Sequence, residues 1–427
     1  MGVELGRPRW LAVSLVLFAF ALGLTLFRLT GWSSAAGSSV KADWAMLDFR
    51  ATVYYPTVAF LNGDNPYDYE HFRTHYPVAD PFPPHPPAIF LVSLPFGLMD
   101  YAHAAVAFYL FTIAMTVLVA LLAVRMTNPR GTAALVLTVA SVMILSRPGH
   151  MNLLLGQNTL LFIIGFYVAI YCARTSPCWS AVGVSLACLK PTFGIPLVVL
   201  MLAQRQFRAV FLAVGIAAVM NLPPLVVLIC NSGGLAPLFR SWGSSFGAFE
   251  RDPHVNPLTS PLLLNASGVA SRLVGRPLGA VGEAFILLVV LGVATIALRV
   301  LVRQYGPESR ALATTVLALA ALIAVYHLPY DLLLLTLPCV AFLSRRLPAV
   351  FYAPRLYWSL VALFGILAFN YIATFSGVKA LGLGGLALRL AIELNPIALV
   401  ALFLLVVATL FIERRAITVE LTSRNGG

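Results

Sequence analysis

The chain has 427 residues, of which 60% are hydrophobic and only 10% are charged, and its formal net charge is +12. A soluble protein of this length needs a far more polar surface, so the soluble classes are excluded. Long continuous apolar runs predict an all-α polytopic membrane protein and exclude an outer-membrane barrel, whose strands are short and alternating. The basic excess then belongs to the loops between membrane helices, and no nucleic-acid partner is expected.

Ten apolar segments lie along the chain and predict about ten membrane crossings. Arg7 and Arg9 precede the first segment, and further arginines gather in alternate loops, so the positive-inside rule places both termini in the cytoplasm. We therefore expect a multi-pass protein of the plasma membrane, in contact with membrane lipids. The segments fall near 10–30, 101–124, 131–147, 153–173, 209–230, 279–302, 311–327, 331–344, 356–376 and 388–411.

Two long loops, 31–87 and 231–278, face outward in this topology. Residues 43–61 of the first loop have helical periodicity, and Asp48 and Tyr55 lie away from their apolar face. We expect an amphipathic helix on the outer membrane surface, with Asp48 facing away from lipid. Its apolar stripe is predicted at Leu47, Tyr54, Val58 and Leu61.

The segment 178–203 contains a lysine, a glycine and prolines that interrupt a helix, so it predicts a broken re-entrant pair with the break at Lys190. Such backbone is tolerated at membrane depth only where it is buried in protein or lines a wet cavity. The second outer loop is expected to be irregular, and the polar cytoplasmic tail 413–427 is expected to be disordered. We predict one domain over 1–427, with its unusual polar residues collected on the outer side.

These polar residues follow one another in a recognisable order. An aspartate comes soon after the first helix, followed by Tyr and G-x-N-P-Y, a proline-rich entry and L-P-F. The chain shows Asp48, Tyr55, Leu61-Asn62-Gly63, Asn65-Pro66-Tyr67, Pro86-Pro87, Leu94-Pro95-Phe96, Gly156-Gln157-Asn158, Lys190-Pro191 and Tyr326-His327 with Asp331. This set resembles glycosyltransferase family 87, the polyprenyl-phosphate-mannose-dependent mannosyltransferases of the C-type superfamily. The chain departs from the family pattern at His85, where Tyr commonly precedes Pro-Pro.

The resemblance implies a C-type glycosyltransferase fold with an outward-facing active site. It implies an inverting hexosyltransferase, with mannose as the expected sugar, a polyprenyl-phosphate sugar as donor and a glycolipid or polysaccharide as acceptor. Because the lipid phosphate is a stable leaving group, one carboxylate that takes the proton of the acceptor hydroxyl suffices. Asp48 is the candidate base and Asp43 its competitor, and a solvated acid on a helix face is the alternative interpretation of Asp48.

Cations and hydrogen-bond donors should hold the donor phosphate in a water-poor site. Lys190 and His327 are the first candidates, followed by Arg147. Structural alternatives stay open, since Arg147 at a helix end can snorkel to headgroups and Lys190 can bond freed helix carbonyls. The other expected substrate-binding residues are Gln157, Asn158, Tyr55 and Asp331.

No cofactor is expected, and the five cysteines show no metal-site spacing. Asp64 and Asp68 could hold a divalent cation, but turn capping is the favoured interpretation. A secondary transporter or lipid flippase is the alternative function. Transporters carry ionisable residues near the membrane midplane and often show internal repeats, whereas the polar residues of this chain collect at one face.

Overall fold

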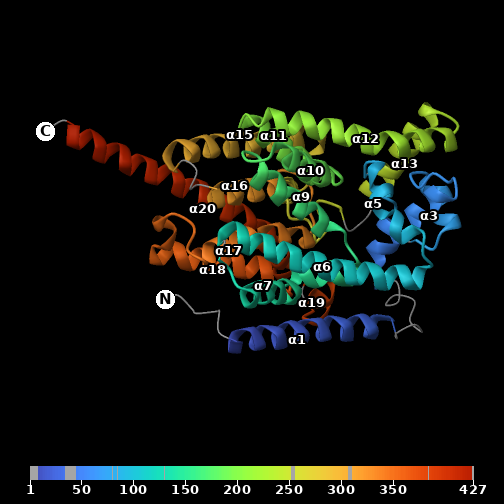
Figure 1. The fold of residues 1–427 in the computed structure, drawn as a ribbon, viewed down its shortest axis with the longest axis horizontal. Coiled ribbons are helices and arrows are strands. Elements are labelled where there is room, and N and C mark those ends of the chain that lie inside the picture. The colour runs from blue at the N-terminus through green and yellow to red at the C-terminus, as the bar shows by residue number, and fades with distance from the viewer. Residues whose placement is uncertain are drawn as a thin grey trace. The chain divides into compact units, whose positions relative to one another are not determined.

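A computed structural model describes residues 8–33, 45–78, 80–83, 85–128, 130–251, 255–305, 310–382 and 384–425. All regular secondary structure in this described part of the chain is helical (Figure 1), which confirms the predicted all-α class. Five helices are long and apolar enough to cross a membrane. They are α1 (Pro8–Ser33), α6 (Tyr101–Thr127), α12 (Phe207–Asn231), α15 (Gly279–Tyr305) and α20 (Gly385–Asn425).

The other predicted crossings form shorter helices. The pair α7 (Ala133–Leu145) and α8 (Arg147–Leu155) is bent by 74° and would count as a sixth span if taken together. Helix length alone therefore does not establish ten crossings. The remaining apolar helices are α5 (Ala88–Gly97), α9 (Thr159–Cys172), α10 (Pro177–Cys188), α11 (Pro191–Ala203), α16 (Arg310–Ala324), α17 (Thr336–Leu343) and α18 (Pro354–Phe369).

The chain forms two compact units, and each draws on several stretches of sequence. The first unit holds residues 1–121, 131–194 and 208–256, and the second holds 122–130, 195–207 and 257–427.

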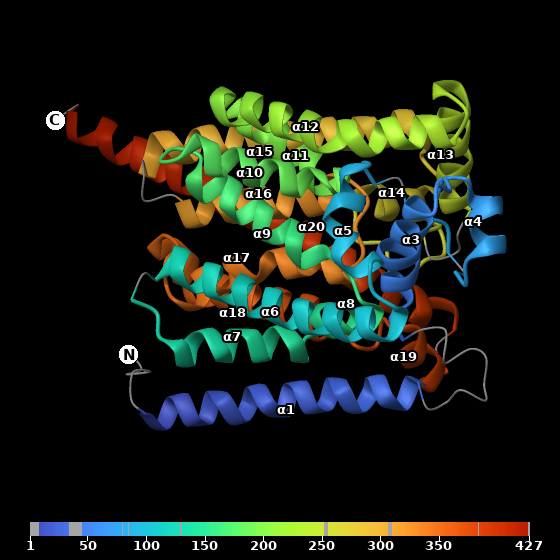
Figure 2. The same cartoon turned by 45° about the vertical axis from the view of Figure 1, so that its right-hand side comes forward.

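In the first unit, α1 lies beside α7, and α9 lies beside α10 (Figures 1 and 2). Glycines allow the second contact to be close. A Cβ atom on Gly183 would lie 2.4 Å from the main-chain nitrogen of Ala169, and one on Gly165 would lie 2.7 Å from the carbonyl oxygen of Gly183. The two short apolar helices thus pack backbone against backbone, as small residues permit in membrane helices.

In the second unit, α16 packs against α15 and α20, and α18 packs against α20 (Figure 2). Every side chain from Leu312 to Ala324 except Ala313 is buried. The helix is thus enclosed by protein on all sides, as expected for a helix that is apolar all round. It is therefore a core helix of this unit, which explains how a segment of 15 residues can be so apolar.

The first outer loop differs from the expected single amphipathic helix. A π-helix, η1 (Phe49–Tyr54), leads into α3 (Tyr55–Leu61), and α4 (Tyr69–His75) follows. Of the predicted stripe, Tyr54 is buried and Leu61 is 42% exposed, and the segment before α3 winds differently from the expected helix, with Phe49 and Val53 buried as well. Pro56 gives the reason, since it has no N–H to donate to the carbonyl four residues earlier and the wider π turn accommodates that gap.

Two further expectations are corrected. The second outer loop is largely helical, with α13 (Leu235–Glu250) and α14 (Ala266–Val274), because its apolar side chains recur at helical spacing. The tail expected to be disordered instead continues α20 to Asn425, with no proline after Pro396 to interrupt it.

Candidate active site

A sharp bend at Ser146 sets up the first part of the site. The Ser146 hydroxyl accepts a hydrogen bond from the Gly149 N–H at 3.2 Å and caps α8. A Cβ atom on Gly149 would lie 1.9 Å from the carbonyl oxygen of Met143, so only glycine fits inside this bend. Arg147, the first residue of α8, is 1% exposed. Its guanidinium therefore lies within the protein, and snorkelling to headgroups does not describe it.

The far end of α8 docks onto the first outer loop. Gly156 ends the helix in the left-handed conformation, with a φ of 72°. A Cβ atom there would lie 2.7 Å from Cβ of Phe49 and 3.1 Å from the Met46 sulfur, so glycine allows the two segments to touch. The Met46 N–H also donates to the Leu154 carbonyl at 2.8 Å.

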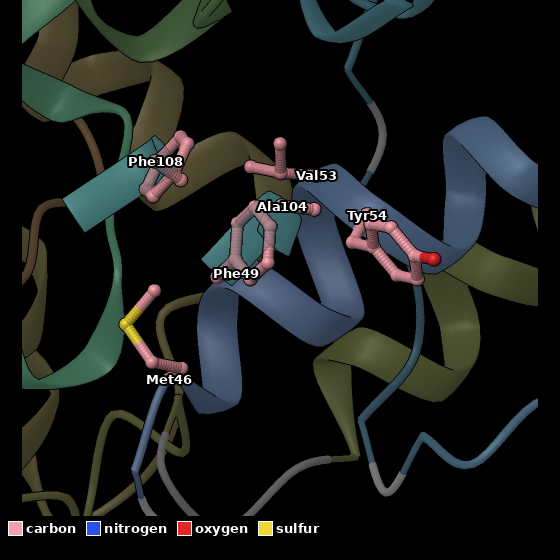
Figure 3. Packing of buried hydrophobic residues seen from close by; sticks show 6 residues of the cluster. All are labelled: Met46, Phe49, Val53, Tyr54, Ala104 and Phe108. Atoms are coloured by element: carbon pink, nitrogen blue, oxygen red, sulfur yellow. The ribbon is translucent and has the colours of Figure 1, made fainter. Parts of the chain in front are cut away.

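An aromatic cluster holds the loop segment in place. The Phe49 ring faces Phe108 of α6, with ring centroids 4.6 Å apart (Figure 3). Met46, Val53 and Tyr54 complete the buried cluster on the loop side. Because Asp48 lies directly between two residues of this cluster, its backbone position is set by packing.

Asp48 and Gln157 meet at this junction, although 109 residues separate them in sequence. The Gln157 Nε2 atom donates to Asp48 Oδ2 at 2.5 Å. Asp48 is half-buried, whereas Gln157 is 7% exposed and its N–H is bonded to the Asn152 carbonyl at 2.9 Å. The predicted base and one predicted substrate-binding residue thus share a hydrogen bond, and the buried amide fixes the orientation of the carboxylate.

Two more predicted residues lie on the same elements. Asn158 is 8% exposed and begins α9 directly after Gln157. Tyr55 stacks on Tyr101, with ring centroids 5.9 Å apart and an interplanar angle of 7°. Burial raises the pKa of Tyr55, and the charge of Arg50 partly opposes this rise. Tyr55 is therefore a neutral phenol at physiological pH, and its ring stacks on Tyr101.

Lys190 lies at the predicted break. The helix α10 ends at Cys188, and α11 begins at Pro191. A Cβ atom on Gly194 would lie 2.6 Å from Cα of Cys188, so the first turn of α11 packs directly on the last residue of α10. The interruption of the helix at Lys190 is confirmed, and the re-entrant course of the pair stays a prediction. The half-buried Lys190 ammonium lies 5.2 Å from the Phe193 ring centroid.

His327 and Asp331 form a pair in the second unit. The His327 Nδ1 atom lies 2.9 Å from Asp331 Oδ2, and neither side chain has exposed surface. The same carboxylate oxygen accepts the Leu328 N–H at 3.1 Å. The His327 carbonyl in turn accepts the Leu264 N–H at 3.2 Å. The predicted histidine and aspartate are thus joined, and the carboxylate fixes the orientation of the imidazole.

Comparison with known families places these residues in context. A family model described as glycosyltransferase family 87 matches residues 84–329, which is more than half of the chain. The chain belongs to glycosyltransferase family 87. No curated protein sequence matches it. Because the long apolar helices of this family 87 protein are those of a membrane protein, it is an integral membrane glycosyltransferase.

The family match and the geometry cover different parts of the site. Gln157, Lys190 and His327 lie inside the matched range, whereas Asp48 precedes it. Asp48 is therefore supported by its contact with Gln157 and not by the family match. Its competitor Asp43 lies outside the residues that the structure describes.

The G-x-N-P-Y turn of this glycosyltransferase has a structural role. Asn65 Nδ2 donates to the Ser232 hydroxyl at 3.1 Å, and its Oδ1 accepts the Tyr67 N–H at 3.0 Å. Asp64 accepts the Tyr76 hydroxyl at 2.6 Å, and Asp68 caps α4. Both acids are thus engaged in loop bonds. The described part of the chain contains no group of three or more metal-ligating side chains.

His85 is the residue that sequence reasoning missed as a part of the site. It was singled out only as a departure from the family pattern. The structure buries it to 8% exposure and brings its ring to the break beside Lys190. Its burial and its bond to a main-chain carbonyl leave no pattern in the sequence, so no local signal could have found it.

Proposed function

We propose that this glycosyltransferase moves a hexose, with mannose as the first candidate, from a polyprenyl-phosphate sugar to a hydroxyl of a glycolipid or polysaccharide. Transfer would take place at the extracytoplasmic face of the plasma membrane. The hydrogen bond between Gln157 and the half-buried Asp48 carries the proposal. It joins an oriented carboxylate to a segment that lies inside the family match.

One displacement accounts for the chemistry. The acceptor oxygen attacks the anomeric carbon and forms the new glycosidic bond, while the bond from that carbon to the phosphate oxygen breaks. The acceptor proton passes to Asp48, and the electron pair leaves with the lipid phosphate. A single displacement inverts the anomeric configuration. The leaving group is stable as an anion, so this reaction needs no second carboxylate of the glycosidase type.

Cationic side chains would stabilise the phosphate as its charge develops. Lys190 is the first choice, because it is half-buried and the helix break holds it. Arg147 and His327 rank behind it, because Arg147 is 1% exposed and neither His327 nor Asp331 has exposed surface. A ligand would first have to displace side chains that neighbour them.

A lipid-flippase or transporter function receives no separate support. Membership of a glycosyltransferase family favours group transfer. Moreover, Asp48 and Gln157 lie at a junction of an outer loop with a helix end, whereas transport sites lie on broken helices near the midplane. In the predicted topology the first outer loop lies on the extracytoplasmic side. The proposed glycolipid or polysaccharide acceptor would meet the donor on that side.

Donor turnover by the purified protein tests the proposal. Radiolabelled polyprenyl-phosphate mannose is supplied together with membranes of a deletion strain as the source of acceptor, and released polyprenyl phosphate is measured. We expect Asp48→Asn to lower turnover by roughly 10²–10⁴-fold, because asparagine cannot take the proton. The matched control is Asp100→Asn, at a carboxylate that is 64% exposed, and it should keep wild-type turnover. Full activity of Asp48→Asn would remove Asp48 as the base.

The donor side is tested in the same assay with Lys190→Ala. Loss of a preorganised cation at the leaving phosphate should lower turnover by roughly 10²-fold or more. Full activity of Lys190→Ala would remove this lysine from the donor site. If the wild-type protein does not transfer mannose but transfers another hexose from polyprenyl phosphate, the proposed sugar is wrong and the proposed reaction type is retained.

A further inference from the structure

His85 connects the outer loop to the helix break. Its Nδ1 atom lies 3.0 Å from the carbonyl oxygen of Leu189, the residue before Lys190. Leu189 and Lys190 together form the break between α10 and α11. The Phe82 and Phe162 rings flank the imidazole, with centroids 6.0 and 6.2 Å away. The ring is therefore held in one place by packing against these two tilted rings and by one hydrogen bond at its edge.

The hydrogen bond determines the tautomer of His85. A carbonyl oxygen can only accept, so Nδ1 carries the hydrogen and donates to Leu189. Burial, together with the nearby Lys190 charge, lowers the pKa of His85 to about 4. The imidazole is therefore uncharged at neutral pH. Because His85 is neutral, the positive charge of this pair lies on Lys190.

The backbone of His85 is held as firmly as its ring. The Tyr67 hydroxyl donates to the His85 carbonyl at 2.5 Å, and the His85 N–H donates to the Pro83 carbonyl at 2.7 Å. Tyr67 has no exposed surface and belongs to the N-P-Y turn. A chain of contacts thus leads from that turn through His85 to the peptide that carries Lys190.

We propose that His85 is a positioning residue for Lys190, which it sets through the bond from Nδ1–H to the Leu189 carbonyl. This inference rests on the proposed function, in which the Lys190 ammonium faces the phosphate of the lipid donor. A helix end leaves carbonyl groups without intrahelical partners, and the imidazole satisfies one of them at the break. Without that bond the Leu189–Lys190 peptide loses one of its restraints and keeps the bond from the Lys190 N–H to the Ala187 carbonyl at 3.2 Å, so a small tilt of the peptide shifts the ammonium.

Three substitutions at one position separate the two ring nitrogens. In His85→Asn, the amide nitrogen is attached to Cγ as Nδ1 is, so the variant can still donate to Leu189. In His85→Gln, the amide lies one bond further out, near the Nε2 position. His85→Phe keeps the ring and loses both nitrogens. Positioning through Nδ1 predicts that Asn recovers most of the transfer, while Gln and Phe lower kcat by roughly 10-fold or more.

The readouts are kcat and KM for polyprenyl-phosphate mannose, together with the thermal unfolding midpoint in detergent. We expect kcat to fall in His85→Phe with a similar unfolding midpoint. The matched control is His103→Phe, at a histidine that is 82% exposed, and it should match wild type in both measurements. A fall in the midpoint that His85→Asn shares with His85→Phe would show a structural role only, and would overturn the proposal.

A double-mutant cycle tests whether His85 acts through Lys190. If it does, adding His85→Phe to Lys190→Ala should change kcat by less than about 2-fold, because the group that it positions is already gone. Effects that multiply would overturn the inference. A fully active Lys190→Ala would instead refute the phosphate assignment itself. An inactive Lys190→Ala with an unimpaired His85→Phe would refute only the positioning role.

Discussion

A carboxylate that acts as a base must be held still as well as be ionised. The Gln157 amide provides this restraint for Asp48 through one short bond, and Gln157 is itself fixed by its main-chain bond to Asn152. Packing of Phe49 and Met46 holds the other side of the same junction. The Asp48 carboxylate is therefore oriented from both the loop and the helix.

Removal of the Gln157 amide tests this restraint. Gln157→Leu keeps the volume but cannot donate to Asp48, so we expect kcat to fall by roughly 10-fold while the donor KM changes little. The measurement is steady-state transfer from polyprenyl-phosphate mannose. Gln206→Leu, at a half-buried glutamine in the turn before α12, is the control. Equal kcat values for Gln157→Leu and wild type would show that the bond does not contribute to turnover.

Only part of this residue-scale arrangement could be predicted from the sequence. Asp48 and Gln157 were both singled out, because each belongs to an ordered polar motif in an apolar chain. Their contact could not be predicted, since nothing local brings together residues that are 109 positions apart. His85 was not predicted to be a site residue, because a buried bond to a carbonyl leaves no pattern in the sequence.

At the scale of elements, the fit of α8 onto the loop depends on Gly156. Gly156→Ala introduces a Cβ atom 2.7 Å from Phe49 and also strains a left-handed backbone, a cost of about 1–2 kcal/mol by itself. We expect a lower thermal unfolding midpoint and reduced transfer. Gly63→Ala is the matched control, because Gly63 has a φ of 85° but no atom within 4 Å of the added Cβ. Equal effects of the two variants would mean that the close contact is unimportant.

A buried ion pair joins α14 to α20 in the second unit. Arg272 donates two hydrogen bonds to the Glu393 carboxylate, and its Nη1 atom donates to the Pro257 carbonyl at 3.1 Å. The side chains of Arg272 and Glu393 are 9% and 19% exposed. Bidentate arginine–carboxylate pairs form stronger hydrogen bonds than neutral groups do. Removal of one partner destabilises the fold, because the other charge is left without a counter-ion inside the protein.

Arg272→Met should therefore destabilise the fold by about 3–5 kcal/mol, because it leaves a buried carboxylate without its cation. The measurement is the thermal unfolding midpoint in detergent. The double variant Arg272→Met with Glu393→Leu should recover most of the loss. Arg276→Met, at an exposed arginine beyond the end of α14, is the control. A double variant as unstable as the single one would contradict this account.

Element types were easier to predict than element boundaries. The break at Lys190 was predictable, because prolines and glycines interrupt a helix locally. The π turn before Pro56 was not predicted, because a missing N–H at a proline is compatible both with a simple kink and with a wider turn. Likewise, α13 was missed because its aromatic residues were read as loop residues, although their spacing is helical.

At the scale of the whole molecule, the membrane class follows from composition alone, and the five long helices confirm it. The count of crossings does not follow, because apolar runs of 13–16 residues serve both as short membrane segments and as core helices such as α16. Both termini in the cytoplasm remain a prediction from the distribution of arginine.

Cysteine labelling tests the orientation. In a background with the exposed Cys178 and Cys230 replaced by serine, an impermeant maleimide should label Ser244→Cys in intact cells. It should label the exposed Arg346→Cys only after lysis. Ser245 is unsuitable, because it is buried and its hydroxyl donates to the Phe82 carbonyl. The reverse labelling pattern would invert the topology.

The pair of Arg272 and Glu393 also bears on the order of biosynthesis. Glu393 lies in the last long apolar helix, where a lone carboxylate opposes entry into the bilayer. Its partner lies 121 residues earlier in the chain, so the ribosome delivers the arginine first. The final helix thus meets a ready counter-ion as it inserts. A nascent chain without α14 would present its last segment to the insertion machinery with Glu393 lacking the arginine that binds it in the folded protein.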